Sequence, residues 1–497
     1  MARPPNIVLF FTDNQQAETL GCYGNSEVHT PHLDALSAQG TTFENAYCPN
    51  GFCSPCRASV LTGLLPSQHG VHSWIDDRDS DDWPRNWHAL DGLRTLPAAL
   101  KQMGYRTALC GKYHLGDPST PMPGFDYWCT MADGHVRSFH KNRITENDKT
   151  YEHHGHSVDF FTEKAIGFLK EQDTDTRPFF LYVPYPAPYG HWPATKDPQP
   201  NRFSELYDEC PMQSVPRQGL SKAAIDAYLL REKYSGGGLD YSMPLRAPND
   251  LATLRNYYSQ ISMVDDGVGQ ILRTLDQMNL TDDTLVIFTS DHGLSLGHHG
   301  FWGHGAATYP SNLHRAAHSV PLILSHPPTV RPGQRRQAMI SNMDIFSTIL
   351  DYAGVQDLPD SAPTTSRSLR SLLAGDPASW DRDEVFSEQE ETRVLRTRKW
   401  AYFKRYSPSS GERFPNALYD VENDPGETVN LADTPGYADV LAELDHRLSE
   451  FFHRHARPEA DLWSGGTPIQ NTERGEFWRS VWGQDWRPTY KYASRQE

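Results

Sequence analysis

Two cysteines lie three residues apart in the stretch Cys53-Ser54-Pro55-Cys56-Arg57, within a chain of 497 residues that has seven cysteines. A C-x-x-C pair at the start of a helix is typical of a redox dithiol. Such a pair can also supply half of a zinc site, but no second ligand pair of zinc spacing is matched to it. A third hypothesis is that both thiols are buried and structural. A fourth is that one cysteine matters for a reason other than its thiol.

Other chemically useful side chains follow apolar segments that are typical of buried strands. Asp13 ends the run NIVLFFTD, Lys112 follows YRTALCG, and Asp291 follows TLVIFTS. In open α/β sheets, ligands bind at the carboxyl ends of the strands. We therefore expect these residues to lie at one edge of the sheet.

The elements that position these residues alternate between strand and helix patterns, with caps such as Thr30-Pro31 at helix starts. This alternation predicts an α/β fold with a large, mostly parallel sheet sandwiched by helices. Near residue 375 the pattern changes to short strands with turn signals, which predicts a smaller C-terminal α+β domain with an antiparallel sheet. The expected domains are 1–375 and 376–456, followed by a tail at 457–497.

Several segments lack a periodic pattern. We expect loops at 72–92, 117–155 and 190–245, and we expect them to line the substrate pocket. The aromatic-rich tail should pack on the body or on a neighbouring subunit, which favours a homo-oligomer.

Composition excludes some partners. The net charge is −17, from 63 acidic and 46 basic side chains, which disfavours nucleic acid and anionic membranes. An anionic substrate would need a local positive site, such as a bound cation. No apolar run of about 18 residues is present to cross a membrane. The odd, scattered cysteines and the absence of a secretory pattern in MARPPNIVLFFTD lead us to expect a cytoplasmic protein.

The segment from Cys53 to Gly63 reads C-x-P-x-R followed by L-T-G, and it resembles the signature of the type I sulfatases of the alkaline-phosphatase superfamily. Further similar motifs follow in the family's order: TDNQ with TPHLDALSAQG near the N-terminus, GKYHLG at 111–116, TSDHG at 289–293 and LYDVENDPGETVNLA at 418–432. The resemblance implies an alkaline-phosphatase-like fold. It also implies hydrolysis of a small-molecule sulfate monoester to an alcohol and inorganic sulfate.

In that family a maturation enzyme oxidises the signature cysteine to formylglycine, so the resemblance implies this modification at Cys53. One hydroxyl of the hydrated aldehyde attacks sulfur, and the second allows sulfate to leave. Cys56 fills a position that tolerates several small residues. Arg57 is implied to hold the aldehyde hydrate, beside an anion site at the helix N-terminus.

The resemblance also implies a metal site, formed by Asp13, Asn14, Cys53, Asp291 and His292. Oxygen ligands with one imidazole suit a hard divalent cation, Ca²⁺ first and Mg²⁺ or Mn²⁺ next. Many family members have a second aspartate where this chain has Asn14.

Four further residues complete the implied site. Lys112 would bind sulfate oxygens, and His114 would act as the base on the second hydroxyl. We expect these two side chains to lie on an extended segment and to point to one side. His191 resembles the family's H-x-P histidine on the leaving-group side. His304 stands where the family usually has a lysine, and we expect it to protonate the leaving group.

Three other functions remain open from the sequence. A phosphonate monoester or phosphodiester hydrolase of the same superfamily would use the same nucleophile. A thiol–disulfide protein would use Cys53 and Cys56. A noncatalytic relative would keep Cys53 unmodified.

Overall fold

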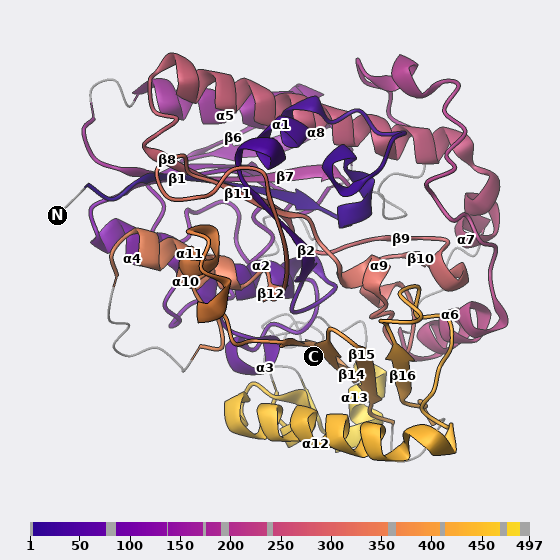
Figure 1. Ribbon diagram of the computed structural model, residues 1–497. Helices are drawn as coiled ribbons and strands as arrows, with labels where there is room; N and C mark the ends of the chain where they lie inside the picture. Colours follow the sequence, from indigo (N-terminus) through magenta and orange to yellow (C-terminus); the bar gives the residue numbers. More distant parts are fainter. Residues whose placement is uncertain are drawn as a thin grey trace.

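The structure is a computed structural model, and it describes residues 3–75, 86–136, 138–171, 175–189, 198–235, 242–355, 364–407, 413–467 and 475–487. Figure 1 shows a large sheet between two layers of helices, with a smaller unit below it. In spatial order, the described strands of the large sheet are β12 (Gln334–Ser341), β2 (Thr41–Tyr47), β11 (Leu322–Ser325), β8 (Thr284–Ser290), β1 (Asn6–Asp13), β7 (Phe179–Pro188), β3 (Arg106–Gly111), β4 (Tyr127–Met131), β5 (His140–Glu146) and β6 (Lys149–His156).

The central strands are parallel and fully buried. β1 pairs in parallel with β8 on one side and β7 on the other, and all three are continuous apolar runs, as expected for strands covered on both faces. β11 is antiparallel to its neighbours, as are β5 and β6. The register aligns Thr12 with Ser290, so Asp13 and Asp291 emerge side by side at the carboxyl edge.

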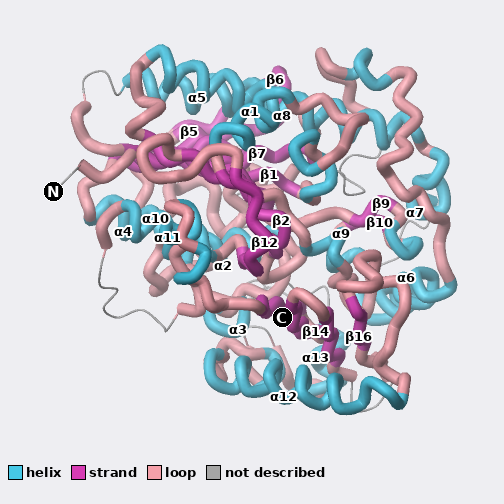
Figure 2. Tube along the Cα trace, viewed as in Figure 1, coloured by secondary structure: helices cyan, strands magenta, loops and turns pink. Residues whose placement is uncertain are grey.

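Helices cover both faces of this sheet, and Figure 2 shows them on either side of the strands. One face carries α1 (Pro31–Gln39), α5 (Ser157–Lys170) and α8 (Leu251–Gln277). The other carries α2 (Cys53–Thr62), α4 (Leu96–Gln102), α10 (Asp344–Tyr352) and α11 (Arg370–Leu373). Further elements of this unit are α3 (Pro66–His69), α6 (Lys222–Ser235), α7 (Ser242–Arg246), α9 (Arg315–His318) and the hairpin of β9 (Ser295–Leu296) with β10 (Trp302–Gly303).

The smaller unit is a four-stranded antiparallel sheet covered by one helix. Its elements are β13 (Glu384–Gln389), β14 (Thr392–Thr397), β15 (Trp400–Arg405), β16 (Ala417–Asp420) and α12 (Ala438–His455). Leu395 and Tyr402 of the sheet pack against Leu444 and Leu448 of α12. The predicted fold class is therefore confirmed. The domain boundaries stay predictions.

Buried ion pairs join the small sheet to the large body. Glu427 accepts from the ring Nδ1 of His314 at 3.1 Å and from the backbone N of Arg315 at 2.9 Å. It also pairs with Arg396 of β14. Glu427 therefore connects segments of both units.

Two of the expected loops contain regular structure. The segment 117–155 holds β4, β5 and β6, which extend the large sheet to its edge. The prediction failed there because the edge strand β6, KTYEHHGH, is polar and largely exposed, so it lacks an apolar run. The segment 190–245 holds α6 and α7, together with residues outside the described ranges.

The described part of the tail packs on the body. In α13 (Gly475–Trp482), Phe477 and Trp478 are buried against Tyr309 and Phe414. Tyr490 and Tyr492 lie outside the described residues. No described helix is long and apolar enough to cross a membrane.

Candidate active site

Four buried side chains converge at the carboxyl edge of the large sheet. They are Asp13 at the end of β1, Asp291 and His292 after β8, and Cys53 at the start of α2. Each offers one ligand atom, and the four atoms lie within 4.8 Å of one another. Elsewhere in the described ranges, no group of three or more His, Cys, Asp or Glu side chains meets this spacing.

Two cations are buried beside the two carboxylates. Nη2 of Arg57 donates to Oδ2 of Asp13 at 2.9 Å and to Oδ2 of Asp291 at 2.8 Å. Nζ of Lys112 lies 2.6 Å from Oδ2 of Asp13. Burial lowers the pKa of Lys112, but Asp13, Cys53 and Asp291 together raise it by more, so this pKa lies above its ordinary value and the side chain is charged.

The charges of these four side chains balance. Asp13 and Asp291 contribute two negative charges, while Arg57 and Lys112 contribute two positive charges. A divalent cation bound to the same group would leave a net positive charge in a buried site. Such a site attracts an anion despite the negative charge of the whole protein.

The ring of His292 is oriented toward Cys53. Its Nδ1 lies 2.9 Å from the carbonyl oxygen of Gly293, and its Nε2 lies 3.4 Å from Sγ of Cys53. Nδ1 therefore carries the proton, which leaves the Nε2 lone pair directed at the cluster. This is the usual arrangement of a histidine that binds a metal.

Asn14 also fits a cation site. It has a left-handed backbone conformation, with φ 61°, and its backbone N donates to Oδ1 of Asp291 at 3.1 Å. Its side chain is fully buried, and neither side-chain polar atom has a hydrogen-bond partner among the residues that the structure describes. A buried amide without a partner is costly. A cation that takes the amide oxygen as a ligand would remove this cost.

The surroundings of Cys53 do not fit a redox dithiol. Its side chain is buried, and burial raises the pKa of its thiol well above the ordinary value, with a further rise from Asp13. Burial likewise raises the pKa of the Cys56 thiol. Reactive thiols are accessible and have lowered pKa values, so the structure argues against the thiol–disulfide hypothesis.

The expectation that Lys112 and His114 share an extended segment is wrong. β3 ends at Gly111, and His114 has a left-handed conformation with φ 57°. Its carbonyl oxygen accepts from Oγ of Ser54 at 2.8 Å, which ties this turn to the first turn of α2. The backbone at His114 therefore turns toward α2 and does not continue as an extended strand.

His114 has the geometry of a neutral base. Its Nε2 lies 2.9 Å from the carbonyl oxygen of Ile75, so the proton is on Nε2. Nδ1 is buried and has no partner within the described part of the chain. Burial lowers the pKa of His114 well below its usual range, and the Lys112 cation lowers it further. The ring is therefore neutral near pH 7.

His304 lies beside the metal candidates. Its ring centroid is 5.4 Å from that of His292 and 4.8 Å from that of Phe52, which precedes Cys53. Its Nδ1 accepts from the backbone N of Ala306 at 3.2 Å. The ring proton therefore lies on Nε2, which makes Nε2 a hydrogen-bond donor. His191 lies outside the described residues.

The sequence interpretation missed two residues near this site, His135 and Tyr189. The hydroxyl of Tyr189 lies 3.1 Å from Nε2 of His135, and the two rings are 5.2 Å apart. Nζ of Lys112 lies 5.2 Å from the centre of the Tyr189 ring, and the His135 ring is 5.1 Å from that of His114. No local spacing signals His135, since the chain has 22 histidines.

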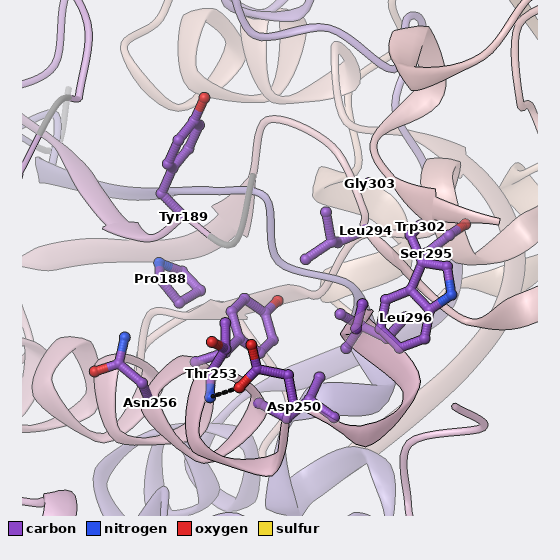
Figure 3. A pocket seen from close by; sticks show the side chains of 13 residues that line it. Pro188, Tyr189, Asp250, Thr253, Asn256, Leu294, Ser295, Leu296, Trp302 and Gly303 are labelled. Carbon is purple, nitrogen blue, oxygen red and sulfur yellow. Dashed lines mark hydrogen bonds between the residues drawn. The ribbon is translucent and has the colours of Figure 1, made fainter. Parts of the chain in front are cut away.

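A cavity adjoins the metal candidates on the side of α8 (Figure 3). Its lining comes from the end of β7, the start of α8 and the β9–β10 hairpin. Figure 3 shows Asp250 and Thr253 of the α8 start on one side and Trp302 on another. Tyr257, also in the lining, donates from its hydroxyl to the carbonyl oxygen of Asn14 at 2.7 Å. The cavity therefore lies behind the loop of Asn14, and none of the predicted site residues that the structure describes lines it.

Comparison with known proteins gives consistent matches. A family model described as Sulfatase matches residues 5–355, and one described as N-sulphoglucosamine sulphohydrolase, C-terminal, matches residues 311–454. N-acetylglucosamine-6-O-sulfatase of Bacteroides thetaiotaomicron is 26% identical over 90% of this chain and 86% of its own. N-sulphoglucosamine sulphohydrolase of Homo sapiens is 30% identical over 90% of each chain.

A solved structure shares the fold. It is a complex with D-glucosamine-2-N,6-O-disulfate, and it superposes with a TM-score of 0.70 at 24% identity. The superposition covers 91% of this chain and 98% of the other.

Proposed function

This chain belongs to the sulfatase family and hydrolyses a sulfate ester, and from that premise we propose that it acts through formylglycine at position 53 and one divalent cation. The observation that carries the proposal is the cluster of ligand atoms from Asp13, Asp291, His292 and Cys53 within 4.8 Å. This cluster joins the modifiable side chain to a metal site.

The donor set fits a hard divalent cation. Asp13 and Asp291 supply carboxylate oxygens, Asn14 an amide oxygen and His292 its Nε2. We propose Ca²⁺, with Mg²⁺ or Mn²⁺ as alternatives, because oxygen ligands dominate. When bound, the cation supplies positive charge that polarises the sulfate group and the modified side chain.

Formylglycine supplies a nucleophilic oxygen that a cysteine lacks, and a formylglycine-generating maturation enzyme would install it at Cys53. The chain's own residues do the remaining work. Arg57, which Asp13 and Asp291 fix one turn after position 53 in α2, would hold the hydrated aldehyde. The helix N-terminus directs free backbone N–H groups at the anion.

Lys112 and two histidines act on the oxygens of the reacting sulfate ester. Lys112 is charged and faces the site, so it binds sulfate oxygens. His114 is neutral and takes a proton through Nδ1. The neutral ring of His304 donates a hydrogen bond from Nε2 to the leaving oxygen and stabilises the negative charge that develops there, while the alcohol takes its proton from solvent. His191 is proposed to contact the leaving group of the sulfate ester.

We propose a small sugar sulfate as substrate, of the glucosamine class. Two similar proteins are named for N-acetylglucosamine 6-O-sulfate and N-sulphoglucosamine. The candidate residues that the structure describes are at most 5% exposed, which fits a single sulfate at a chain end better than one within a polymer. The net charge of −17 also disfavours a long polyanion.

A substrate panel tests this proposal. It compares kcat/KM for glucosamine 6-sulfate, N-sulfoglucosamine, choline sulfate and nitrophenyl sulfate, with a phosphonate monoester as the superfamily alternative. We expect a sugar sulfate to give the highest value. Preference for the phosphonate ester would reject the sulfatase mechanism. Preference for choline sulfate would reject the proposal that the substrate is a sugar sulfate.

The assembly and compartment are also proposals. All seven cysteines are free, which suits a reducing compartment such as the cytoplasm. Ile225 and Leu229 lie one turn apart on α6 and are 43% and 53% exposed, a feature that supports a homo-oligomer. Mass in solution and cell fractionation test these two points.

A further inference from the structure

The tip of the β13–β14 hairpin is buried inside the molecule. Its strands pair as far as Gln389 and Thr392, and Glu390 in the two-residue turn has φ 45°. Both Gln389 and Thr392 are 0% exposed. Hairpin turns usually face solvent, so a buried tip indicates a specific contact with the catalytic body.

The tip binds the loop that leads into α2. Four hydrogen bonds join them: Ser387 Oγ to Cys48 O (2.9 Å), Glu388 N to Pro49 O (2.9 Å), Asn50 Nδ2 to Glu388 O (2.8 Å) and Gly51 N to Gln389 Oε1 (3.1 Å). The last bond lies two residues before Cys53. The loop position thus depends on the hairpin.

The side-chain amide of Gln389 also lies against a second loop, the turn at His304 and Gly305. A Cβ atom on Gly305 would lie 2.4 Å from Oε1 of Gln389, and one on Gly51 would lie 2.8 Å from that atom. The Gly51 Cβ would also lie 3.3 Å from Cα of Gly305. Neither glycine has a left-handed φ, so close approach is what requires glycine at both positions.

These two loops carry the reacting groups. Gly51 and Phe52 precede Cys53, while Gly305 directly follows His304. The rings of Phe52 and His304 are 4.8 Å apart. The Gln389 amide and this ring pair therefore hold the two loops together at two points.

We propose that Gln389 is a positioning residue, whose amide fixes the 48–52 loop against the His304–Gly305 turn and so sets the place of His304 relative to residue 53. This inference rests on the proposed role of His304. It assigns the small C-terminal sheet a part in the reaction, because the hairpin delivers the amide. A displacement of a catalytic group by about 1 Å can cost roughly 10²-fold in rate.

The test uses full-length protein made with the maturation enzyme. The variants are Gln389→Ala, Gln389→Leu and Gln389→Glu. Leucine keeps the side-chain volume but lacks the oxygen that accepts from Gly51 N, whereas glutamate keeps that oxygen. Glu384→Gln is the matched control, because Glu384 pairs with Arg447 at the far end of the same strand. Formylglycine content, metal content and melting temperature are measured for every variant.

The informative readout is the ratio of kcat/KM for a sugar sulfate to that for nitrophenyl sulfate. Nitrophenolate leaves with little protonation, so a misplaced donor harms the sugar ester more. We expect Gln389→Ala and Gln389→Leu to lower this ratio roughly 10–100-fold at unchanged formylglycine content. Gln389→Glu and Glu384→Gln should keep the ratio within about threefold of wild type.

A second measurement uses the glycine contact. Gly305→Ala should lower the same ratio, because its methyl group meets Gln389. In the Gly305→Ala variant, the added change Gln389→Ala should lower this ratio by a smaller factor than Gln389→Ala does in the wild-type protein, because removing the Gln389 amide makes room for the methyl group. Strict additivity would overturn the inference, as would equal losses on both esters.

The two proposals can fail separately. If His304→Ala leaves the substrate ratio unchanged, the proposed role of His304 is wrong, and the inference about Gln389, which depends on that role, is wrong as well. If His304→Ala lowers the ratio but Gln389→Ala does not, only the role of Gln389 is wrong.

Discussion

Sγ of Cys53 lies 3.4 Å from Nε2 of His292, although 239 positions separate the two residues in the chain. The contact places the first residue of α2 against the loop after β8. A metal bound by His292 would therefore also reach the formylglycine that we propose at position 53.

Cys53 should be converted to formylglycine when the protein is made with the maturation enzyme. Mass spectrometry of the peptide that spans position 53 measures the conversion. Cys53→Ser should lose nearly all activity, because a serine lacks the second hydroxyl that releases sulfate. Cys56→Ser is the matched control and should remain active. Fully active protein with an unmodified thiol would contradict the mechanism.

Removal of the divalent cation should abolish activity but leave the protein folded. Arg57 and Lys112 balance the charges of Asp13 and Asp291 without a metal. Ca²⁺ at 100 times its Kd should stabilise the protein by about 2.7 kcal/mol, seen as a higher Tm. In Asp291→Asn this rise should shrink or vanish, whereas exposed Asp381→Asn should keep it. An equal rise in both variants would place the ion elsewhere.

His304→Ala should lower kcat/KM for alkyl and sugar sulfates by about 10²–10⁴-fold. The loss for nitrophenyl sulfate should be much smaller, because that leaving group needs little protonation. His298→Ala is the control, since His298 lies six positions earlier in the turn between β9 and β10. Equal losses on both esters would make His304 a sulfate-binding residue, and His191 would become the better candidate for the donor.

The acid limb of the pH–kcat profile should lie below pH 6.5, the ordinary pKa of histidine. Burial first, then Lys112 and His135, lower the pKa of His114. A base works in its neutral form, so activity is kept as pH falls until this lowered pKa is reached. His135→Asn removes one cause of the shift and should move the limb slightly upward. A limb above 6.5 in the wild type would exclude neutral His114 as the base.

Glu427→Ala should destabilise the protein by about 3–5 kcal/mol at pH 7, measured by urea unfolding. Burial raises the pKa of Glu427, but Arg396 and His314 lower it by more, and it lies well below its ordinary value. The stabilisation is therefore fully present above about pH 4.3 and is lost as pH falls through the lower folded pKa. The exposed pair of Glu422 with Lys399 is the control, and Glu422→Ala should cost at most about 1 kcal/mol.

Much of the central architecture could be predicted from the sequence. NIVLFFTD and TLVIFTS are continuous apolar runs, which mark buried parallel strands, and each is followed by a metal candidate. The edge strand β6 and its neighbour β5 could not be predicted, because their exposed polar side chains remove the apolar signal. The turn at His114 was also missed, since its left-handed backbone depends on contacts with Ser54 and Ile75.

The sequence by itself indicated the proposed nucleophile, the strand-end carboxylates and the order of the motifs, because these depend on residue type and on spacing within short segments. Only the tertiary structure decided which distant groups act together. Gln389 meets Gly51 across 338 positions, and His135 meets Tyr189 across 54. Such contacts depend on how whole elements pack, and close packing leaves no local pattern in the chain.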